Sequence, residues 1–360
     1  MKGTEQLHER GQSLWLDNIS RDLLDSRTLQ RYIDELSITG LTSNPTIFDH
    51  AIKNSNAYDA GISKRAGQSV SPEELFFELA LEDLSRAAEL FRPIHEITNG
   101  VDGWVSLEVS PLLAHDTAMT LAAARKLYER ANLPNLMIKI PGTTEGLPAI
   151  EEAIFSGVPI NVTLLFSREQ YLAAADAYLR GIERRVAAGL NPNVISVASL
   201  FVSRWDVAVA NKVPVKLRDQ LGIAIAKRAY SASGRLHSSQ RSRRLYNFGA
   251  RPQRLLWAST GTKSPDASKT IYARALAAPF TVNTMPEDTL KAVAVETDLD
   301  ELLQPDGSSG EEILTEFAKE GIDVEALATQ LQDEGARSFV NSWSDLMKVI
   351  SSKSASIARK

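Results

Sequence analysis

One lysine lies inside a short apolar segment of this chain, and it is the residue best suited to covalent chemistry. The segment reads Leu-Met-Ile-Lys-Ile over residues 136–140, and Lys139 is its charged residue. Strand side chains point alternately to two faces, so Lys139 lies opposite Ile138 and Ile140. Burial lowers the pKa of a lysine, and the neutral amine attacks a ketone to form a Schiff base. A lysine that is paired or solvated at the strand end is the alternative that this segment leaves open.

In other apolar segments, polar residues occupy the alternate positions, as Lys139 does in its own segment. Asp17, Glu108, Asn161 and Thr163 each alternate with apolar neighbours, as Lys139 does. One lysine with two carboxylates, without Ser-His-Asp or metal-ligand spacing, fits Schiff-base chemistry on a carbonyl compound. Forming and breaking an imine needs acid and base groups, and cleaving a carbon–carbon bond needs a base on a hydroxyl.

Composition excludes several other classes of protein. The chain has 360 residues, 43% hydrophobic and 24% charged, with a formal net charge of −5, which gives no reason to expect nucleic-acid binding. Because it has no cysteine, disulfides, thiolate catalysis and cysteine-based metal sites are excluded. The five histidines are scattered, so we expect no metal site. No apolar run approaches the roughly 20 residues of a membrane span, and the N-terminus lacks an apolar signal-peptide centre, so we expect a cytoplasmic protein without membrane contact.

Short apolar segments alternate with longer helical patterns and predict the elements that position these residues. Their number predicts an α/β fold, a single (β/α)8 TIM barrel, whose active site is built from the C-terminal ends of several strands. An open doubly wound sheet is the alternative, but no GxGxxG turn follows any segment. The predicted strands are Ser13–Asp17, Ile38–Leu41, Gly103–Val109, Leu136–Ile140, Pro159–Leu164, Val194–Ser199, Arg254–Ala258 and Phe280–Asn283.

We expect residues 1–360 to form one domain, with the barrel over about 13–284. A helical insertion is predicted over 207–250, between the sixth and seventh strands, and closing and extra C-terminal helices over 285–360. Apolar spacing within Asp323–Ser351 predicts a helix packed on the outside of the barrel, and a partner-binding or dimer helix is the alternative.

The polar stretch Thr262–Ser268 is interpreted as a working loop. The basic stretch Arg235–Arg244 is interpreted as a solvated helix end, with an anion site as the alternative.

Several motifs, in their order along the chain, resemble the transaldolase family. They are Leu-Thr-Ser-Asn-Pro-Thr (41–46), Val-Ser-Leu-Glu-Val-Ser (105–110), Ile-Lys-Ile-Pro-Gly-Thr (138–143) and Ile-Asn-Val-Thr-Leu (160–164), and the resemblance runs from about Trp15 to Asn283. It implies cofactor-free and metal-free transfer of a dihydroxyacetone unit in the pentose phosphate pathway. The donor would be sedoheptulose 7-phosphate or fructose 6-phosphate, and the acceptor glyceraldehyde 3-phosphate or erythrose 4-phosphate.

The resemblance also implies catalytic roles. Lys139 would be the nucleophile that attacks C2 of the ketose phosphate. Glu108 and Thr163 would hold the water that shuttles protons while the imine forms and breaks. Asp17 would take the proton from the C4 hydroxyl as the C3–C4 bond breaks.

Sugar and phosphate contacts follow from the same resemblance. Asn44 and Asn161 would hydrogen-bond the bound sugar, and Asn161 would help to retain the three-carbon intermediate. In Ser-Leu-Phe-Val-Ser-Arg (199–204), Ser199 and Arg204 match the family's serine and phosphate-binding arginine, and Phe201 matches an aromatic wall. Arg204 on a surface helix is the alternative.

The seventh strand departs from the better-known family pattern. In that pattern an alanine and a serine are followed by a second phosphate-binding arginine, whereas the run Trp-Ala-Ser-Thr-Gly-Thr-Lys (257–263) has none. Ser259 can still donate to phosphate, and we hypothesise that Lys263 supplies the second positive charge as a point charge. The alternative is a solvated loop lysine, with Arg204 alone neutralising the phosphate.

Two other functions compete with a transaldolase. A fructose-6-phosphate aldolase uses the same chemistry with free dihydroxyacetone, but its family has a much smaller chain without the Asp17–Glu108 pair in this form. A catalytically silent sugar-phosphate-binding barrel would have no use for an inward lysine with acid–base partners. The sequence leaves open the preferred donor and acceptor, and whether the protein is a monomer or a homodimer.

Overall fold

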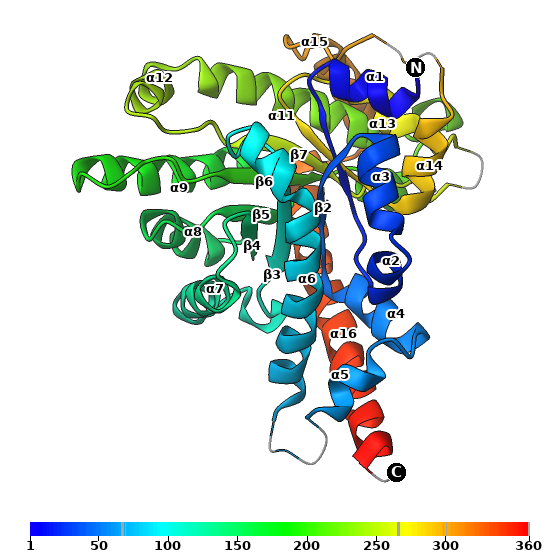
Figure 1. Ribbon diagram of the computed structural model, residues 1–360. Helices are drawn as coiled ribbons and strands as arrows, with labels where there is room; N and C mark the ends of the chain where they lie inside the picture. Colours follow the sequence, from blue (N-terminus) through cyan, green and yellow to red (C-terminus); the bar gives the residue numbers. More distant parts are fainter. Residues whose placement is uncertain (66–67, 69, 265–266, 298, 300, 359–360) are drawn as a thin grey trace.

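Parallel strands pair in chain order, and the pairing of β8 with β1 closes them into an eight-stranded barrel (Figure 1). This computed structural model describes residues 1–65, 68, 70–264, 267–297, 299 and 301–358. It confirms the predicted (β/α)8 barrel. The strands are β1 (Ser13–Leu16), β2 (Ile38–Thr42), β3 (Trp104–Glu108), β4 (Leu136–Pro141), β5 (Ile160–Leu165), β6 (Ser196–Phe201), β7 (Arg254–Ala258) and β8 (Val282–Met285).

The sixth and eighth strands are each displaced by two residues from their predicted bounds. β6 extends to Phe201, because its pairing with β7 continues until Phe201 lies opposite Ala258. β8 begins at Val282, because Phe280 has a φ of +64°, a left-handed conformation that is incompatible with a strand. The shift brings Thr284 into the strand.

Helices follow the strands and pack around the barrel (Figure 1). Several of them begin at a residue whose side chain caps the helix, as at α6 (Pro72–Ile97) and α9 (Arg168–Ala187). The Ser71 and Ser167 hydroxyls accept the backbone N–H groups of Glu74 and Gln170 at the starts of α6 and α9. The helices are α1 (Gly3–Glu9), α2 (Arg21–Asp25), α3 (Thr28–Leu36), α4 (Pro45–Asn54), α5 (Asp59–Ser63), α6 (Pro72–Ile97), α7 (Thr117–Ala131), α8 (Gly146–Phe155), α9 (Arg168–Ala187), α10 (Ser203–Val209), α11 (Leu221–His237), α12 (Gln240–Asn247), α13 (Ile271–Ala275), α14 (Glu287–Ala294), α15 (Ser308–Lys319) and α16 (Val324–Ala358), with 3-10 turns at Pro111–Leu113 and Val215–Leu217.

Trp15 fills the barrel interior. Its Nε1 donates to Asp102 Oδ1 at 2.7 Å, which satisfies both buried polar groups. A Cβ at Gly40 would lie 2.7 Å from Trp15 Nε1, so only glycine lets β2 approach the indole. The packed interior closes the barrel and leaves the strand ends as the place for a site.

The connection from β6 to β7 contains α10, α11 and α12, in the region of the predicted insertion at 207–250. The Asp206 carboxylate of α10 joins this helix to α11 and α13, because it accepts the Leu221 N–H and the Tyr272 hydroxyl, each at 2.8 Å. In the basic stretch 235–244, the Arg241 guanidinium donates to both oxygens of Glu183 at 2.7 and 2.8 Å. That guanidinium is thus paired with a carboxylate of α9.

The C-terminal helix α16 lies outside the barrel wall, as predicted, but it packs over the end of the barrel rather than beside the outer ring. It contacts α4, α5, α6 and β5 (Figure 1). Gln332 Nε2 donates to the carbonyl oxygens of Gly142 at 3.1 Å and Leu164 at 2.9 Å, close to the C-terminal ends of β4 and β5. This helix therefore belongs to the surroundings of the strand ends.

Some predicted segments include residues outside the described ranges. These are 265 and 266 of the predicted working loop, and 298, 300, 359 and 360 of the predicted C-terminal region. Among the helices of the described residues, none combines the length and apolarity needed to cross a membrane.

We predict that Asp206→Ala lowers the free energy of unfolding by about 3 kcal/mol, because it leaves a buried N–H and a buried hydroxyl without an acceptor. Urea denaturation followed by tryptophan fluorescence measures the change. Tyr272→Phe is the control and should cost only about 1 kcal/mol, since the carboxylate keeps its backbone donors. Equal stability losses in the two variants would contradict this role of Asp206.

Candidate active site

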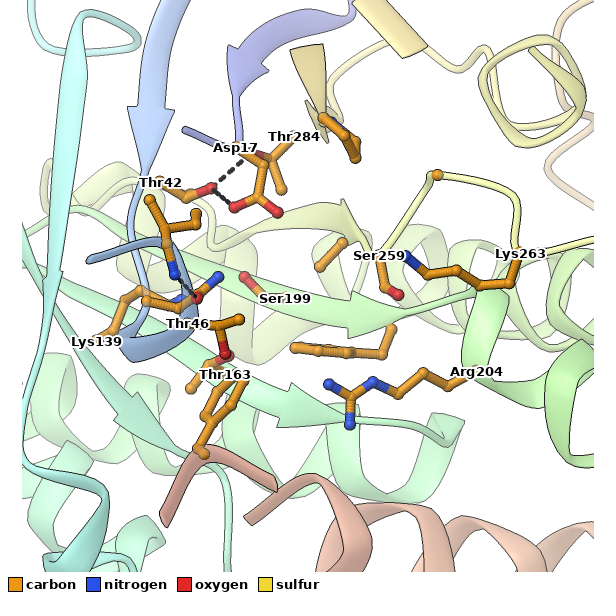
Figure 2. A pocket seen from close by; sticks show the side chains of 17 residues that line it. Asp17, Thr42, Thr46, Lys139, Thr163, Ser199, Arg204, Ser259, Lys263 and Thr284 are labelled. Carbon is orange, nitrogen blue, oxygen red and sulfur yellow. Dashed lines mark hydrogen bonds between the residues drawn. The ribbon is translucent and has the colours of Figure 1, made fainter. Parts of the chain in front are cut away.

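A cavity of about 240 Å³ opens at the C-terminal ends of the strands. Figure 2 shows Lys139 and Asp17 at one end of it, and Arg204 and Lys263 at the other. The structure brings most of the predicted site residues to this cavity. Those lining it are Asp17, Asn44, Lys139, Thr163, Ser199, Phe201, Arg204, Ser259 and Lys263. Glu108 and Asn161 are buried next to this group rather than in the lining.

Lys139 and Glu108 form a buried ion pair on neighbouring strands. The register of β3 with β4 sets Glu108 opposite Lys139, so both side chains enter the barrel side by side. Lys139 Nζ lies 3.1 Å from Glu108 Oε2 and donates to the carbonyl of Ser43 at 2.9 Å. The side chains are 6% and 3% exposed, so solvent screens their interaction little.

Asp17 is held by two threonines that sequence reasoning missed as site residues. Thr42 Oγ1 donates to Asp17 Oδ1 at 2.8 Å and lies 2.6 Å from Thr284 Oγ1. Because the single hydroxyl hydrogen of Thr42 is used toward the carboxylate, Thr284 must be the donor to Thr42. A polar residue at the C-terminal end of β2 and of β8 was the signal that could have indicated them.

Burial raises the pKa values of Asp17 and Glu108, the two carboxyl groups predicted to act in catalysis. For Asp17 the positive charge of Lys139 and the hydrogen bond from Thr42 oppose this rise. For Glu108 the charge of Lys139 opposes it, and the negative charge of Asp17 adds to it. Two carboxyls with raised pKa values beside an amine can exchange protons with a reacting group near neutral pH.

The Asn161 side-chain amide is oriented by two serines. Ser199 Oγ donates to Asn161 Oδ1 at 2.7 Å, and Asn161 Nδ2 donates to Ser106 Oγ at 3.3 Å. By contrast, the Thr163 hydroxyl and Glu108 Oε1 are buried without a hydrogen-bond partner among the described residues, whereas Glu108 Oε2 faces Lys139. A bound water can satisfy such a hydroxyl and such a carboxylate oxygen.

Asn44 begins α4 and turns toward the cavity. Its side-chain oxygen accepts the Ile47 backbone N–H at 3.0 Å, which caps the helix. The cap fixes the side chain at the rim, where it lines the cavity together with Thr46.

Two cations meet at the other end of the cavity, where Figure 2 shows Arg204 and Lys263 beside Ser259. Ser259 has a φ of +55°, so the backbone turns sharply after β7. The carbonyl oxygen of Ser259 accepts the Ser203 N–H at 3.0 Å, and their hydroxyls lie 2.9 Å apart. Within the described ranges, neither the Arg204 nor the Lys263 side chain has an ion pair. Free cations beside a hydroxyl are the groups that bind a phosphate.

Phe339 of α16 also lines the cavity and was not predicted as a site residue. The Arg204 Cζ atom lies 5.4 Å from the ring centroid of Phe201 and 6.0 Å from that of Phe339. The sequence identified Phe339 only as part of an apolar helix face, which carries no signal for a site.

A barrel with a buried lysine beside carboxylates, and with cationic side chains at the other end of its cavity, is the arrangement expected of a class of enzymes, the (β/α)8 enzymes that form Schiff bases with phosphorylated carbonyl compounds. Within that class, the chain belongs to the transaldolase/fructose-6-phosphate aldolase family, whose model matches residues 14–350. It is 44% identical to a transaldolase of Thermobifida fusca over 352 residues, which cover 95% of this chain and 96% of that protein. It is 41% identical to the transaldolases of Saccharopolyspora erythraea, covering 96% of each chain, and of Mycolicibacterium smegmatis, covering 95% of this chain and 94% of that one. Similarity of this extent supports transaldolase activity, a group-transfer reaction.

The raised pKa of Asp17 predicts the pH dependence of the reaction. If Asp17 acts as a base, it must be ionised, so kcat/KM falls on acidification with a midpoint above the ordinary carboxyl value of about 4. Thr42→Val removes a hydrogen bond that lowers the pKa of Asp17, and it should move this midpoint to higher pH. Rates measured from pH 4 to 8, with fluorescence to confirm folding, test both statements. A midpoint that is unchanged in Thr42→Val would contradict them.

Proposed function

We propose that the protein transfers a dihydroxyacetone unit from a ketose phosphate to an aldose phosphate, with Lys139 as the nucleophile. The donor is sedoheptulose 7-phosphate or fructose 6-phosphate, and the acceptor is glyceraldehyde 3-phosphate or erythrose 4-phosphate, as in the pentose phosphate pathway. The observation that carries the proposal is the buried Lys139–Glu108 pair at one end of a cavity whose other end has two cations without an ion pair to any described residue. We also propose a cytoplasmic location, where charged sugar phosphates are interconverted.

Imine formation uses the groups nearest to Lys139. Proton transfer to Glu108 gives the neutral amine, which attacks the C2 carbonyl carbon to form a carbinolamine. The C2 hydroxyl then leaves as water after protonation, and the nitrogen lone pair forms the C=N bond. The unpaired Thr163 hydroxyl and the Glu108 oxygens would hold the water that carries these protons.

Cleavage uses Asp17. Its carboxylate takes the proton of the C4 hydroxyl, the C3–C4 bond breaks, and its electron pair moves into the iminium group to give an enamine on Lys139. The aldose phosphate leaves with the new C4 carbonyl. Asn161 and Asn44 would hydrogen-bond the three-carbon unit, which then attacks the carbonyl carbon of the second aldose phosphate in the reverse sequence.

Arg204, Ser259 and Lys263 would bind the phosphate of each substrate. The guanidinium can donate two parallel hydrogen bonds, Lys263 can add a point charge, and Ser259 a hydroxyl. Holding the phosphate at this end places the ketose carbonyl toward Lys139 and so reduces the entropy cost of attack.

We predict that borohydride traps the intermediate on Lys139. After incubation with fructose 6-phosphate and reduction, peptide mass spectrometry should show one reduced three-carbon adduct on the peptide that carries Lys139. Lys139→Arg should show none while its circular dichroism is unchanged. An adduct on a different lysine would reject this site, and a folded wild-type protein without any adduct would favour a binding function.

Release of free dihydroxyacetone separates the two activities of the family. A transaldolase retains the three-carbon unit until an aldose phosphate arrives, so little dihydroxyacetone should appear from fructose 6-phosphate alone. Steady release at the rate of transfer would instead indicate a fructose-6-phosphate aldolase.

We predict that Lys263→Ala raises the KM for phosphorylated substrates about tenfold with little change in kcat, because one charged hydrogen bond to phosphate is lost. Lys269→Ala is the matched control, because Lys269 is an exposed lysine 3.8 Å from Asp288 and outside the cavity lining. Unchanged Michaelis constants in Lys263→Ala would show that Arg204 alone neutralises the phosphate.

A further inference from the structure

One face of α16 touches segments that carry functional side chains. Gln332, Gly335, Phe339 and Ser342 are three or four residues apart, so they form one stripe along the helix. We name these four residues the α16 stripe. Its last member, Ser342, is hydrogen-bonded through its hydroxyl to that of Thr46 on the cavity wall, at 2.8 Å. The helix thus contacts the cavity along several turns.

Gln332 binds a strained part of β5. Leu164 has a φ of +59°, which is uncommon for a residue with a branched side chain, and the register of β5 with β6 shifts between Val162 and Leu165. The Leu164 carbonyl accepts from Gln332 Nε2 at 2.9 Å. Thr163 lies within this irregular segment and directly precedes Leu164, so the hydrogen bond holds the backbone from which the Thr163 hydroxyl points.

Gly335 permits this close approach. A Cβ at this position would lie 2.9 Å from Leu164 Cδ2 and 3.5 Å from Arg204 Nη1. The helix therefore lies directly against both the strained strand end and the phosphate-binding arginine.

Phe339 holds Arg204 without neutralising it. The guanidinium carbon is within cation–π range of Phe201 on β6 and of Phe339 on α16, at 5.4 and 6.0 Å. No side-chain carboxylate in the described ranges pairs with Arg204. Aromatic rings orient the guanidinium while its N–H groups remain available to an anion.

We infer that the α16 stripe is a positioning element with two separable effects: Gln332 orients Thr163 for proton transfer, and Phe339 orients Arg204 for phosphate binding. The inference rests on the proposed function, since it assigns these two residues to the site described above. Neither Gln332 nor Phe339 reacts with the substrate, so each acts through another residue.

The first test replaces Gln332 with methionine, which has similar length but no N–H donors. Gln332→Met should lower kcat and the single-turnover rate of imine formation about tenfold, because Thr163 is displaced, while KM and phosphate affinity stay unchanged. Gln330→Met is the matched control on the same helix, because Gln330 donates only to exposed Glu334. Gln332→Met with a kcat equal to that of the control would overturn this effect.

The second test replaces Phe339 with leucine, which keeps an apolar side chain but removes the ring. Phe339→Leu should raise KM for phosphorylated substrates and the dissociation constant of inorganic phosphate by the same factor, about fivefold, with kcat unchanged. At a saturating concentration of the ketose phosphate donor, its rate with unphosphorylated glyceraldehyde as the acceptor should not change. Phe317→Leu, the same change at a fully buried position of α15, is the control for lost packing.

The two tests distinguish a positioning role from a structural one. Parallel losses of kcat and phosphate affinity in both variants, or values matching the controls, would overturn the inference. Phosphate binding is measured by calorimetry without turnover. If the wild-type protein forms no trapped imine, the proposed function fails. The role of Phe339 is tested separately by phosphate binding, and an unchanged phosphate affinity in Phe339→Leu would reject it.

Discussion

The structure depends on one constraint, the burial of the Lys139 ammonium beside the Glu108 carboxylate. A buried charge is tolerated only with a partner, and removing either member leaves the other uncompensated. The parallel register supplies that partner, because it sets Glu108 opposite Lys139 on one side and Asn161 opposite Lys139 on the other. In the proposed reaction, the same arrangement would put a nucleophile, a proton acceptor and an amide within reach of one carbonyl group.

The second feature of the site is the separation of its charges. Asp17 and Lys139 lie at one end of the cavity, whereas Arg204 and Lys263 lie at the other (Figure 2). Glu108 is buried beside Lys139. Burial raises the pKa values of both carboxyls, so they can take up protons during a reaction. The far end carries the positive charges of Arg204 and Lys263, which in the proposed function would give a phosphorylated substrate a defined orientation.

The backbone is strained at two strand ends, and one of the contacts that hold it comes from α16, a helix remote in sequence. Leu164 and Ser259 both have left-handed φ angles, of +59° and +55°, next to side chains of the site. Such conformations persist only when surrounding contacts hold them. The hydrogen bonds of Ser259 with Ser203, and of Leu164 with Gln332 of α16, supply those contacts.

The sequence alone determined the barrel and the inward parity of Asp17, Glu108, Lys139, Asn161 and Thr163, because strand alternation is a local property with a period of two residues. It also indicated the helix that became α16, from its apolar spacing. The contact of Thr42 with both Asp17 and Thr284 depends on the closed barrel, since β1 lies between β2 and β8 only after the barrel closes. The tertiary structure likewise decided that Phe339 lies against Arg204, and that the strands end at Phe201 and Met285. These are contacts between residues far apart in the chain, and no local pattern encodes which distant surfaces pack together.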